Sequence, residues 1–334
     1  PVRTQRMKDS TAFVTGATGL LGGALARRLA AEDARVRALV RSPHKADFIR
    51  GVDGIEMVQG DVTDVARMRE LIAGCDIVFH CAAAFGNREQ QQRVNVEGTR
   101  CVMQASAEAQ TKRVIHVSSL AVYGYAKYGI LREDEPIIPT AHEPYSQTKA
   151  EGETVVREIA SQHHISYVII RPGMIYGPRA EQWTDRMFRL ARRRPVIWIG
   201  DGGGSTFPVH VDDVVDMMIV TATHLAAHNQ TFNCVHPVPV TWREFLLGYA
   251  KLAGHQSWLG IPPALAVVLA RIVGALSLPG SRAKAAPDAL QGLYSQRSVD
   301  MSKARTLLDW QPKIDLETGI QTCVPCLQAK GWLN

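Results

Sequence analysis

Tyr145 and Lys149 are the two residues of this 334-residue chain whose types and spacing most directly suggest proton transfer. Residues four apart on a helix share one face, so the phenol and the ammonium would project together. A phenol with a pKa of about 10 is a poor acid or base at neutral pH, and a nearby ammonium stabilises the phenolate. We therefore expect Lys149 to lower the pKa of Tyr145, which would donate a proton to a carbonyl oxygen or accept one from an alcohol.

Ser119 completes this predicted catalytic set. It follows the apolar run Arg113–Val117, which has the composition of a buried strand. Ligands of α/β proteins bind at the carboxyl ends of the strands, so the hydroxyl of Ser119 is expected beside Tyr145, where it would hold the substrate oxygen.

A glycine-rich turn must position a cofactor near these residues. Residues 15–22 read TGATGLLG, directly after the apolar run Thr11–Thr15 and before a stretch with helical spacing of Leu and Ala. Gly16 permits the tight turn, Gly19 lets a pyrophosphate approach the backbone, and Gly22 allows the helix to pack closely. The free N–H groups at the start of that helix would bind the phosphates.

The residues after the second expected strand, Val36–Val40, bear on the choice of cofactor. NAD is held by a carboxylate at this point, and none is present. Arg41 and Lys45 follow instead, and an arginine can bind a 2′-phosphate through two parallel hydrogen bonds. The pattern favours NADP over NAD. The alternative is that both side chains simply face solvent in a loop and bind no phosphate.

Eight short motifs follow one another along the chain: residues 15–22 (TGATGLLG), 60–64 (GDVTD), 80–83 (HCAA), 95–99 (NVEGT), 118–124 (SSLAVYG), 145–149 (YSQTK), 171–178 (RPGMIYGP) and 209–214 (VHVDDV). With these motifs the chain resembles, over nearly its whole length, the extended short-chain dehydrogenase/reductase family, also called the NAD-dependent epimerase/dehydratase family.

The resemblance implies roles for further residues. Asp61 and Val62 would lie by the adenine, Pro172 and Gly173 would flank the nicotinamide, and Lys149 would also hold the nicotinamide ribose. The complete predicted cofactor set is Gly16, Thr18, Gly19, Leu20, Leu21, Gly22, Arg41, Lys45, Asp61, Val62, Ala82, Ala83, Asn95, Tyr145, Lys149, Pro172 and Gly173.

The chain departs from parts of this family at three places. Members that dehydrate sugar nucleotides carry Thr-Asp-Glu where residues 119–121 read Ser-Leu-Ala. Epimerases that grip a nucleotide diphosphate tend to carry an Asn and an Arg where this chain has Gly173–Met174 and Ser205–Pro208. An uncharged lining binds a diphosphate poorly, so we expect a substrate without one. The resemblance is closer to the 3β-hydroxysteroid dehydrogenase and dihydroflavonol reductase branch.

These observations predict an NADP(H)-dependent oxidoreductase that transfers a hydride between nicotinamide and a ketone or secondary alcohol of a hydrophobic small molecule. An epimerase, in which hydride leaves and returns to one substrate, is the first alternative. A regulator that binds the cofactor without chemistry is the second. The intact set of Ser119, Tyr145 and Lys149 argues against it, because a sensor does not need these residues.

Alternating strand-like and helical stretches predict an α/β fold with a Rossmann-type, doubly wound parallel sheet and a smaller C-terminal substrate lobe. We assign residues 1–177 and 207–235 to the dinucleotide-binding domain, and residues 178–206 and 236–334 to the lobe. A hydrophobic content of 46% suffices for a large core. The resemblance implies a homodimer through helices near residues 91–109 and 146–161.

The remaining features are weaker signals. The net charge of +6 comes without a nucleic-acid motif, so we expect no nucleic-acid partner. The six cysteines show no disulfide spacing, no secretory signal precedes the first strand, and the histidines lack metal-ligand spacing, so we predict a cytoplasmic protein without a metal. Residues 262–279 carry one charge, Arg271, and are expected to form a buried or lid helix, with a peripheral membrane contact as the alternative.

Overall fold

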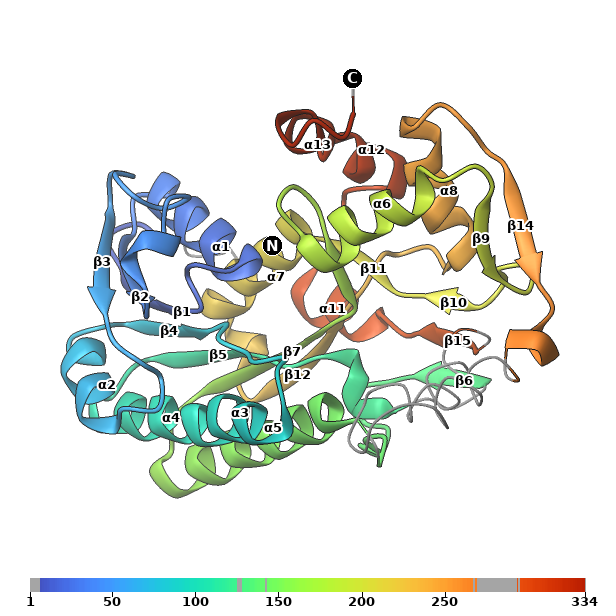
Figure 1. Ribbon diagram of the computed structural model, residues 1–334. Coiled ribbons are helices and arrows are strands. Elements are labelled where there is room, and N and C mark those ends of the chain that lie inside the picture. The colour runs from blue at the N-terminus through green and yellow to red at the C-terminus, as the bar shows by residue number, and fades with distance from the viewer. Residues whose placement is uncertain are drawn as a thin grey trace.

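A sheet of parallel strands forms the centre of the computed structural model, which describes residues 7–124, 128–141, 143–266, 268, 293 and 295–333 (Figure 1). Its seven strands lie in the order β12-β7-β5-β4-β1-β2-β3. Their bounds are β1 (Thr11–Thr15), β2 (Arg35–Val40), β3 (Ile55–Gln59), β4 (Ile77–His80), β5 (Arg113–Val117), β7 (Tyr167–Pro172) and β12 (Gln230–Cys234). The predicted Rossmann-type sheet is confirmed, and the strands expected at Thr11–Thr15, Val36–Val40 and Arg113–Val117 are present as β1, β2 and β5.

Helices cover both faces of this sheet, which explains why its strands are apolar without alternation. In β1, Ala12 and Val14 pack into the core on one face and Phe13 into the core on the other. The first face carries α1 (Leu20–Ala31) and α7 (Val211–Thr223), and the second carries α2 (Val65–Ile72), α4 (Gly98–Glu108) and α5 (Pro144–His163) (Figure 1).

Local signals in the sequence set the starts of the two helices that matter most for the site. Helix α1 begins at Leu20, directly after the glycine turn. Helix α5 begins at Pro144, whose fixed φ suits a first helical position, so Tyr145 and Lys149 lie in its first two turns. The connecting segments contain η1 (Pro43–Lys45), α3 (Arg88–Gln91), η2 (Gln92–Glu97), η3 (Leu120–Tyr123) and η5 (Leu225–Ala227).

A smaller lobe lies beside the carboxyl ends of the strands and has its own apolar core, which includes Phe188, Trp242 and Phe245 (Figure 1). Its helical segments are η4 (Glu181–Asp185), α6 (Arg186–Ala191), α8 (Trp242–Leu252), α12 (Leu316–Gln321) and α13 (Val324–Ala329). Strands β9 (Val196–Ile199) and β14 (Trp258–Ile261) pair with each other in parallel.

Short strand pairs and one more helix join the lobe to the sheet. The pairs are β8 (Met174–Tyr176) with β11 (Pro208–His210), β10 (Ser205–Thr206) with β13 (Val240–Thr241), and β6 (Tyr128–Leu131) with β15 (Gln296–Val299). Helix α11 (Ser302–Leu308) follows β15.

The structure covers only part of the apolar segment 262–279 and describes all six cysteines. Within the described residues no helix combines the length and apolar character needed to span a bilayer. Of the apolar segment 262–279, only residues 262–266 and 268 are described, so the predicted helix lies mostly outside the described residues. All six cysteines are free.

Candidate active site

The glycine turn between β1 and α1 has the geometry of a phosphate cradle. Gly16 has a φ of +68°, and a Cβ there would lie 2.8 Å from the carbonyl carbon of Cys81 at the end of β4. A Cβ on Gly22 would lie 2.5 Å from the backbone oxygen of Gly16. Gly16 is therefore required for the turn to pack against the end of β4, and Gly22 for α1 to pack against the turn.

The start of α1 is open to a ligand. Its N-cap is Gly19, which supplies no side-chain cap, and its first turn carries no acidic residue. The first N–H groups of a helix have no acceptor within the helix, and the helix dipole favours an anion there. Gly19 and Leu20 line a cavity of about 770 Å³, so this end of the helix fits a dinucleotide pyrophosphate.

Asp61 and Arg41 lie at the far end of the same cavity. The Asp61 carboxylate accepts hydrogen bonds from the backbone and hydroxyl of Thr63 at 3.0 and 2.8 Å. Although burial opposes them, these bonds, together with the charges of Arg93 and Arg41, hold the pKa of Asp61 below its usual value. A fixed carboxylate and an exposed guanidinium thus face the position predicted for the adenosine half of the cofactor.

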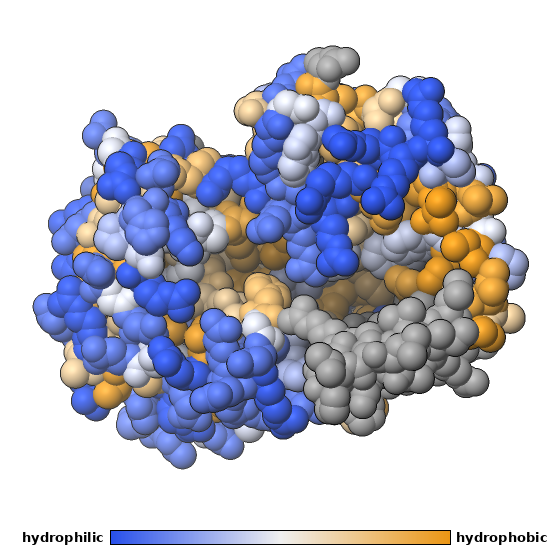
Figure 2. Space-filling model, viewed as in Figure 1, coloured by the Kyte–Doolittle hydropathy of each residue, from blue (hydrophilic) through white to orange (hydrophobic). Residues whose placement is uncertain are grey.

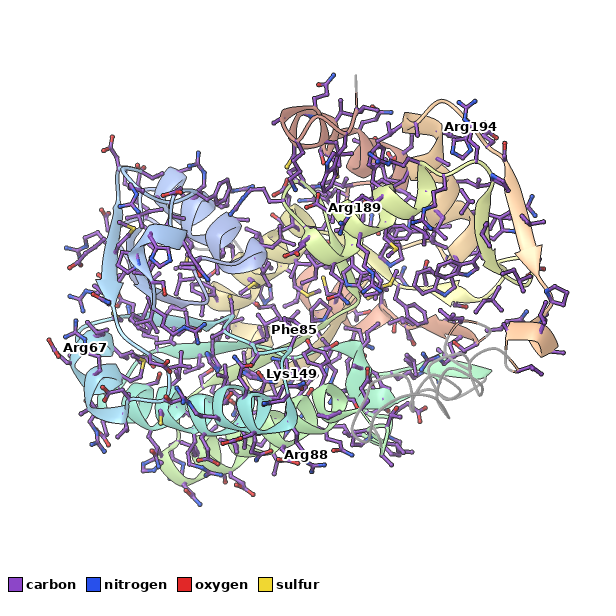
Figure 3. All side chains as sticks on the ribbon, viewed as in Figure 1. Arg67, Phe85, Arg88, Lys149, Arg189 and Arg194 are labelled. Atoms are coloured by element: carbon purple, nitrogen blue, oxygen red, sulfur yellow. The ribbon has the colours of Figure 1, made fainter. Side chains whose placement is uncertain are left out.

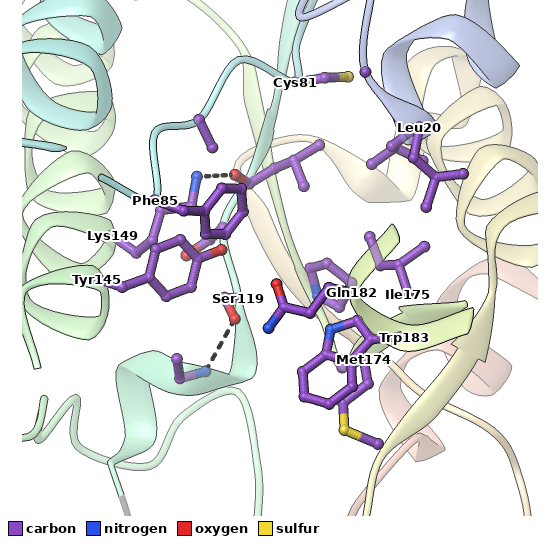
Figure 4. Close-up of a pocket in the computed structure, with 18 of the residues that line it drawn as sticks. Leu20, Cys81, Phe85, Ser119, Tyr145, Lys149, Met174, Ile175, Gln182 and Trp183 are labelled. Atoms are coloured by element: carbon purple, nitrogen blue, oxygen red, sulfur yellow. Dashed lines mark hydrogen bonds between the residues drawn. The ribbon is translucent and has the colours of Figure 1, made fainter. Parts of the chain in front are cut away.

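Lys149 projects from α5 into the middle of the molecule (Figure 3), and Tyr145 lies near it on the same helix at the cavity (Figure 4). The Lys149 side chain is 2% exposed, and its Nζ donates a hydrogen bond of 2.6 Å to the backbone oxygen of Val117 (Figure 4). Burial lowers the pKa of Lys149 to about 8, although the carboxylate of Glu153 opposes this shift. The phenyl ring of Phe85 stacks on Tyr145 with the ring centroids 4.9 Å apart.

The expected effect of Lys149 on Tyr145 is not found in the free protein, and this prediction needs correction. Burial raises the pKa of Tyr145 to about 12, a hydrogen bond with Ser119 opposes the rise, and the charge of Glu143 adds to it. The ammonium of Lys149 is bonded to Val117 instead. Tyr145 is therefore protonated at neutral pH and suited to donate a proton.

A buried ion pair beneath the site connects three of its elements. The guanidinium of Arg171, at the end of β7, donates two hydrogen bonds of 2.8 and 2.7 Å to the Glu153 carboxylate on α5. Glu153 also accepts a hydrogen bond of 2.6 Å from the hydroxyl of Ser118, next to Ser119. Both charged side chains are at most 1% exposed. The pair therefore fixes α5 relative to the ends of β5 and β7.

All the predicted site residues except Lys45 and Asn95 line the cavity. Lys45 is exposed in η1. Asn95 is buried behind the cavity wall, where its amide pairs with the backbone of Ala84 at 2.8 and 3.2 Å and donates to Thr148 at 3.0 Å. Asn95 therefore holds the loop after β4 against α5.

Residues from the lobe and from the segments that join it to the sheet close the cavity opposite Ser119 and Tyr145, and most of these have no recognisable motif. Apolar and aromatic side chains predominate, with a few polar or charged ones: Met174, Ile175, Ala180, Glu181, Gln182, Trp183, Ser205, Thr206, Phe207, Trp242, Leu293 and Arg297. The amide of Gln182 faces Ser119 and Tyr145, with Trp183 beyond it (Figure 4). Figure 2 shows the opening as a hollow with apolar surface inside.

Arg297 is a site residue that sequence reasoning missed. Its guanidinium donates a hydrogen bond of 2.6 Å to the backbone oxygen of Gly124 and lies 5.6 Å from the ring of Phe207. The lining at Gly173–Met174 and Ser205–Pro208 is uncharged as expected, but Arg297 brings a cation to it from far along the chain. No local pattern distinguishes this arginine from a surface residue, because β15 alone places it.

Comparison with known proteins agrees with this geometry. The sequence profile of the NAD dependent epimerase/dehydratase family matches residues 12–234. The chain is 29% identical to a 4-hydroxy-2-methyl-3-oxo-4-farnesyl-3,4-dihydroquinoline-1-oxide ketoreductase of Stigmatella aurantiaca, across 92% of this chain and 94% of that protein. It is 28% identical to the 3beta-hydroxysteroid-dehydrogenase/decarboxylase isoform 1 of Arabidopsis thaliana, across 86% of this chain and 71% of that protein.

The fold is also that of a solved structure. The epimerase Mth375 of Methanothermobacter thermautotrophicus superimposes with a TM-score of 0.79 at 22% identity, covering 97% of this chain and 94% of that chain. The profile match extends from the glycine turn through Ser119, Tyr145 and Lys149 to β12, the last strand of the sheet in chain order. The chain therefore belongs to the NAD dependent epimerase/dehydratase family, the extended short-chain dehydrogenases/reductases, and is an NAD(P)-dependent enzyme.

Proposed function

We propose that this protein is an NADP(H)-dependent oxidoreductase that interconverts a ketone and a secondary alcohol on a hydrophobic small molecule. The observation that carries the proposal is the single cavity in which the glycine turn, Ser119 and Tyr145 meet an apolar wall formed by residues such as Met174 and Phe207. Binding cavities with an apolar lining and few polar groups select apolar ligands and orient them by those groups.

The roles of the chain's own residues follow from their positions. A nicotinamide, when bound, supplies the hydride for the carbonyl carbon or accepts it from the alcohol. In reduction, the hydroxyls of Ser119 and Tyr145 donate hydrogen bonds to the carbonyl oxygen, and Tyr145 transfers its proton to that oxygen. Lys149 holds a positive charge behind Tyr145, which stabilises the resulting phenolate. Its contact with Val117 keeps the ammonium in place.

Replacement of Tyr145 by Phe tests the proposal. We expect turnover to fall by at least about 10²-fold, because the variant loses the general acid. The measurement is the consumption of NADPH with a panel of apolar ketones and 3-oxo compounds. NADPH binding by the variant, followed by fluorescence, separates lost chemistry from lost affinity. Unchanged turnover would refute the role of Tyr145.

Arg41 carries the proposed preference for NADP. Arg41→Ala should weaken NADPH binding about tenfold and leave NADH binding nearly unchanged, because only NADPH has the 2′-phosphate that a guanidinium binds. Lys45→Ala is the matched control, since Lys45 lies nearby in the chain but outside the cavity. An equal loss of affinity for NADPH and NADH in Arg41→Ala would contradict the proposal.

An epimerase is the second candidate, and Arg297 is the observation that favours it. A buried guanidinium in the substrate half of the cavity is suited to bind a substrate phosphate. An epimerase would return the hydride to its substrate, so the bound cofactor would show no net consumption. Tightly held cofactor without NADPH turnover on any ketone would therefore favour this candidate.

A further inference from the structure

The outer face of the two-stranded β9–β14 sheet is apolar. Parallel pairing places Ile197 beside Leu259 and Ile199 beside Ile261. Because side chains alternate along a strand, these four lie on one face. The other face carries Val196, Trp198 and Trp258, which pack into the core of the lobe. Both faces of the sheet are therefore apolar, although only one is buried in the lobe.

This apolar face is exposed to solvent. Ile197 is 46% exposed and Leu259 is 51% exposed, and the chain after β14 adds Leu265, which is 49% exposed. A sheet that packs on one side only normally carries polar residues on the other. Figure 2 shows apolar surface gathered at the end of the molecule where β9 and β14 lie. We call Ile197, Ile199, Leu259, Ile261 and Leu265 the β9–β14 face.

Positive charge lies next to the β9–β14 face. Arg192, Arg193 and Arg194 are exposed and precede β9 by a single proline. Nη2 of Arg194 donates a hydrogen bond of 2.7 Å to the backbone oxygen of Gly254, shortly before β14, so the triplet lies at the amino ends of both strands. Figure 3 shows Arg194 at the periphery of this lobe.

The sequence around the two strands also places arginines next to a stretch without charged residues. Residues 186–200 contain five arginines and no carboxylate, and residues 256–270 contain no charged side chain. An apolar face with a cluster of cations at one end is complementary to an anionic bilayer surface, where apolar side chains enter the interface and arginines bind lipid phosphates. A contact between two copies through the same face would bring two arginine triplets to one interface, and like charges there are unfavourable.

We propose that the β9–β14 face docks the protein on membranes that contain anionic lipids, with the arginine triplet at the headgroups. The inner side of this sheet adjoins the cavity, because the ring of Trp198 lies 5.0 Å from that of Trp242, which lines the cavity. Docking would thus bring the substrate half of the cavity close to apolar molecules dissolved in the bilayer. This last consequence rests on the proposed function, whereas docking itself does not.

Vesicle co-sedimentation of the full chain, without cofactor or substrate, tests the docking. We expect binding to vesicles of phosphatidylcholine with phosphatidylglycerol, weaker binding to pure phosphatidylcholine, and a decrease as salt rises. Arg193→Ala should weaken binding about fivefold, the effect of one basic residue near an anionic surface. Leu259→Ser should weaken it by about tenfold, because an apolar side chain is lost from the interface.

Matched controls separate docking from general effects. Leu225→Ser removes an 80% exposed leucine in η5, which packs against α7 and β12 of the sheet domain. Arg88→Ala removes an exposed arginine of α3, which lies far from β9 and β14 (Figure 3). Neither should change vesicle binding. Circular dichroism and thermal unfolding confirm that each variant folds.

Three results would overturn the proposal. The first is that the protein does not bind anionic vesicles. The second is that the control variants lose as much vesicle binding as Arg193→Ala and Leu259→Ser. The third is that light scattering shows a dimer that Leu259→Ser dissociates. A protein that binds vesicles but reduces no ketone would refute the proposed function and leave the docking intact.

Discussion

At the scale of residues, burial acts in opposite directions on Lys149 and Tyr145. Each side chain is driven toward its neutral form, so the pKa of the lysine falls to about 8 and the pKa of the phenol rises to about 12. The free protein therefore holds a neutral phenol beside a lysine that is charged only up to slightly alkaline pH. This combination is suited to donating a proton to a carbonyl oxygen.

The pH dependence of ketone reduction follows from these two values. Lys149 is protonated below pH about 8 and loses its charge as the pH rises through that value. Under the proposed function this charge stabilises the phenolate that forms when Tyr145 gives up its proton, so kcat/KM for reduction should decrease above this pH, by about tenfold per unit once most lysine is neutral. Lys149→Arg, which stays charged, should shift the decrease to higher pH. A profile that stays flat up to the ordinary lysine pKa would contradict the assignment.

At the scale of elements, the turn between β1 and α1 needs one glycine for packing and another for the approach of the cofactor. Gly22 is needed for packing, because a Cβ would lie 2.5 Å from the backbone oxygen of Gly16. Gly19 has an ordinary φ of −83°, and a Cβ there would approach protein atoms no closer than 3.2 Å while lying at the cavity. Substitution of each should therefore have a different effect.

Gly22→Ala should lower the free energy of unfolding by about 1–3 kcal/mol, because the extra methyl group overpacks the turn. Gly19→Ala should unfold like the unchanged protein yet bind NADPH more weakly, because its methyl group stands where the phosphates approach. Thermal unfolding and fluorescence titration with NADPH measure the two effects. Equal destabilisation by both substitutions would refute this separation.

At the scale of the whole molecule, Asp213 joins the sheet domain to the C-terminal part of the chain. It lies buried in α7, and its carboxylate accepts hydrogen bonds from the backbone N–H groups of Lys313 and Ile314 at 2.9 and 3.2 Å. The chain then continues into α12 and α13 of the lobe.

The predicted homodimer through residues 91–109 and 146–161, which include α4 and much of α5, stays a prediction.

Asp213→Ala should lower the free energy of unfolding by about 1–3 kcal/mol, because two backbone N–H groups lose their acceptor. Asp212→Ala is the control, since the neighbouring side chain is 62% exposed. Denaturant unfolding of both variants measures the difference. Similar stability of the two variants would show that Asp213 contributes little to this junction.

Much of the fold and half of the site were accessible from the sequence alone. The strands at Thr11–Thr15, Val36–Val40 and Arg113–Val117, the glycine turn, and the grouping of Ser119, Tyr145 and Lys149 all depend on short-range rules. These rules are apolar runs for buried strands, glycine where a side chain would collide, and a four-residue spacing on a helix. The eight motifs, in their order along the chain, then indicated the family.

Only the tertiary structure decided the rest. Trp242 and Arg297 reach the cavity from distant segments, Asn95 turns out to support its wall, and the pKa of Tyr145 rises where the spacing alone suggested a fall. The physical reason is that burial and electrostatic environment depend on which distant segments pack together. Local spacing determines which groups share a helix face, whereas packing determines how much water and charge each group meets.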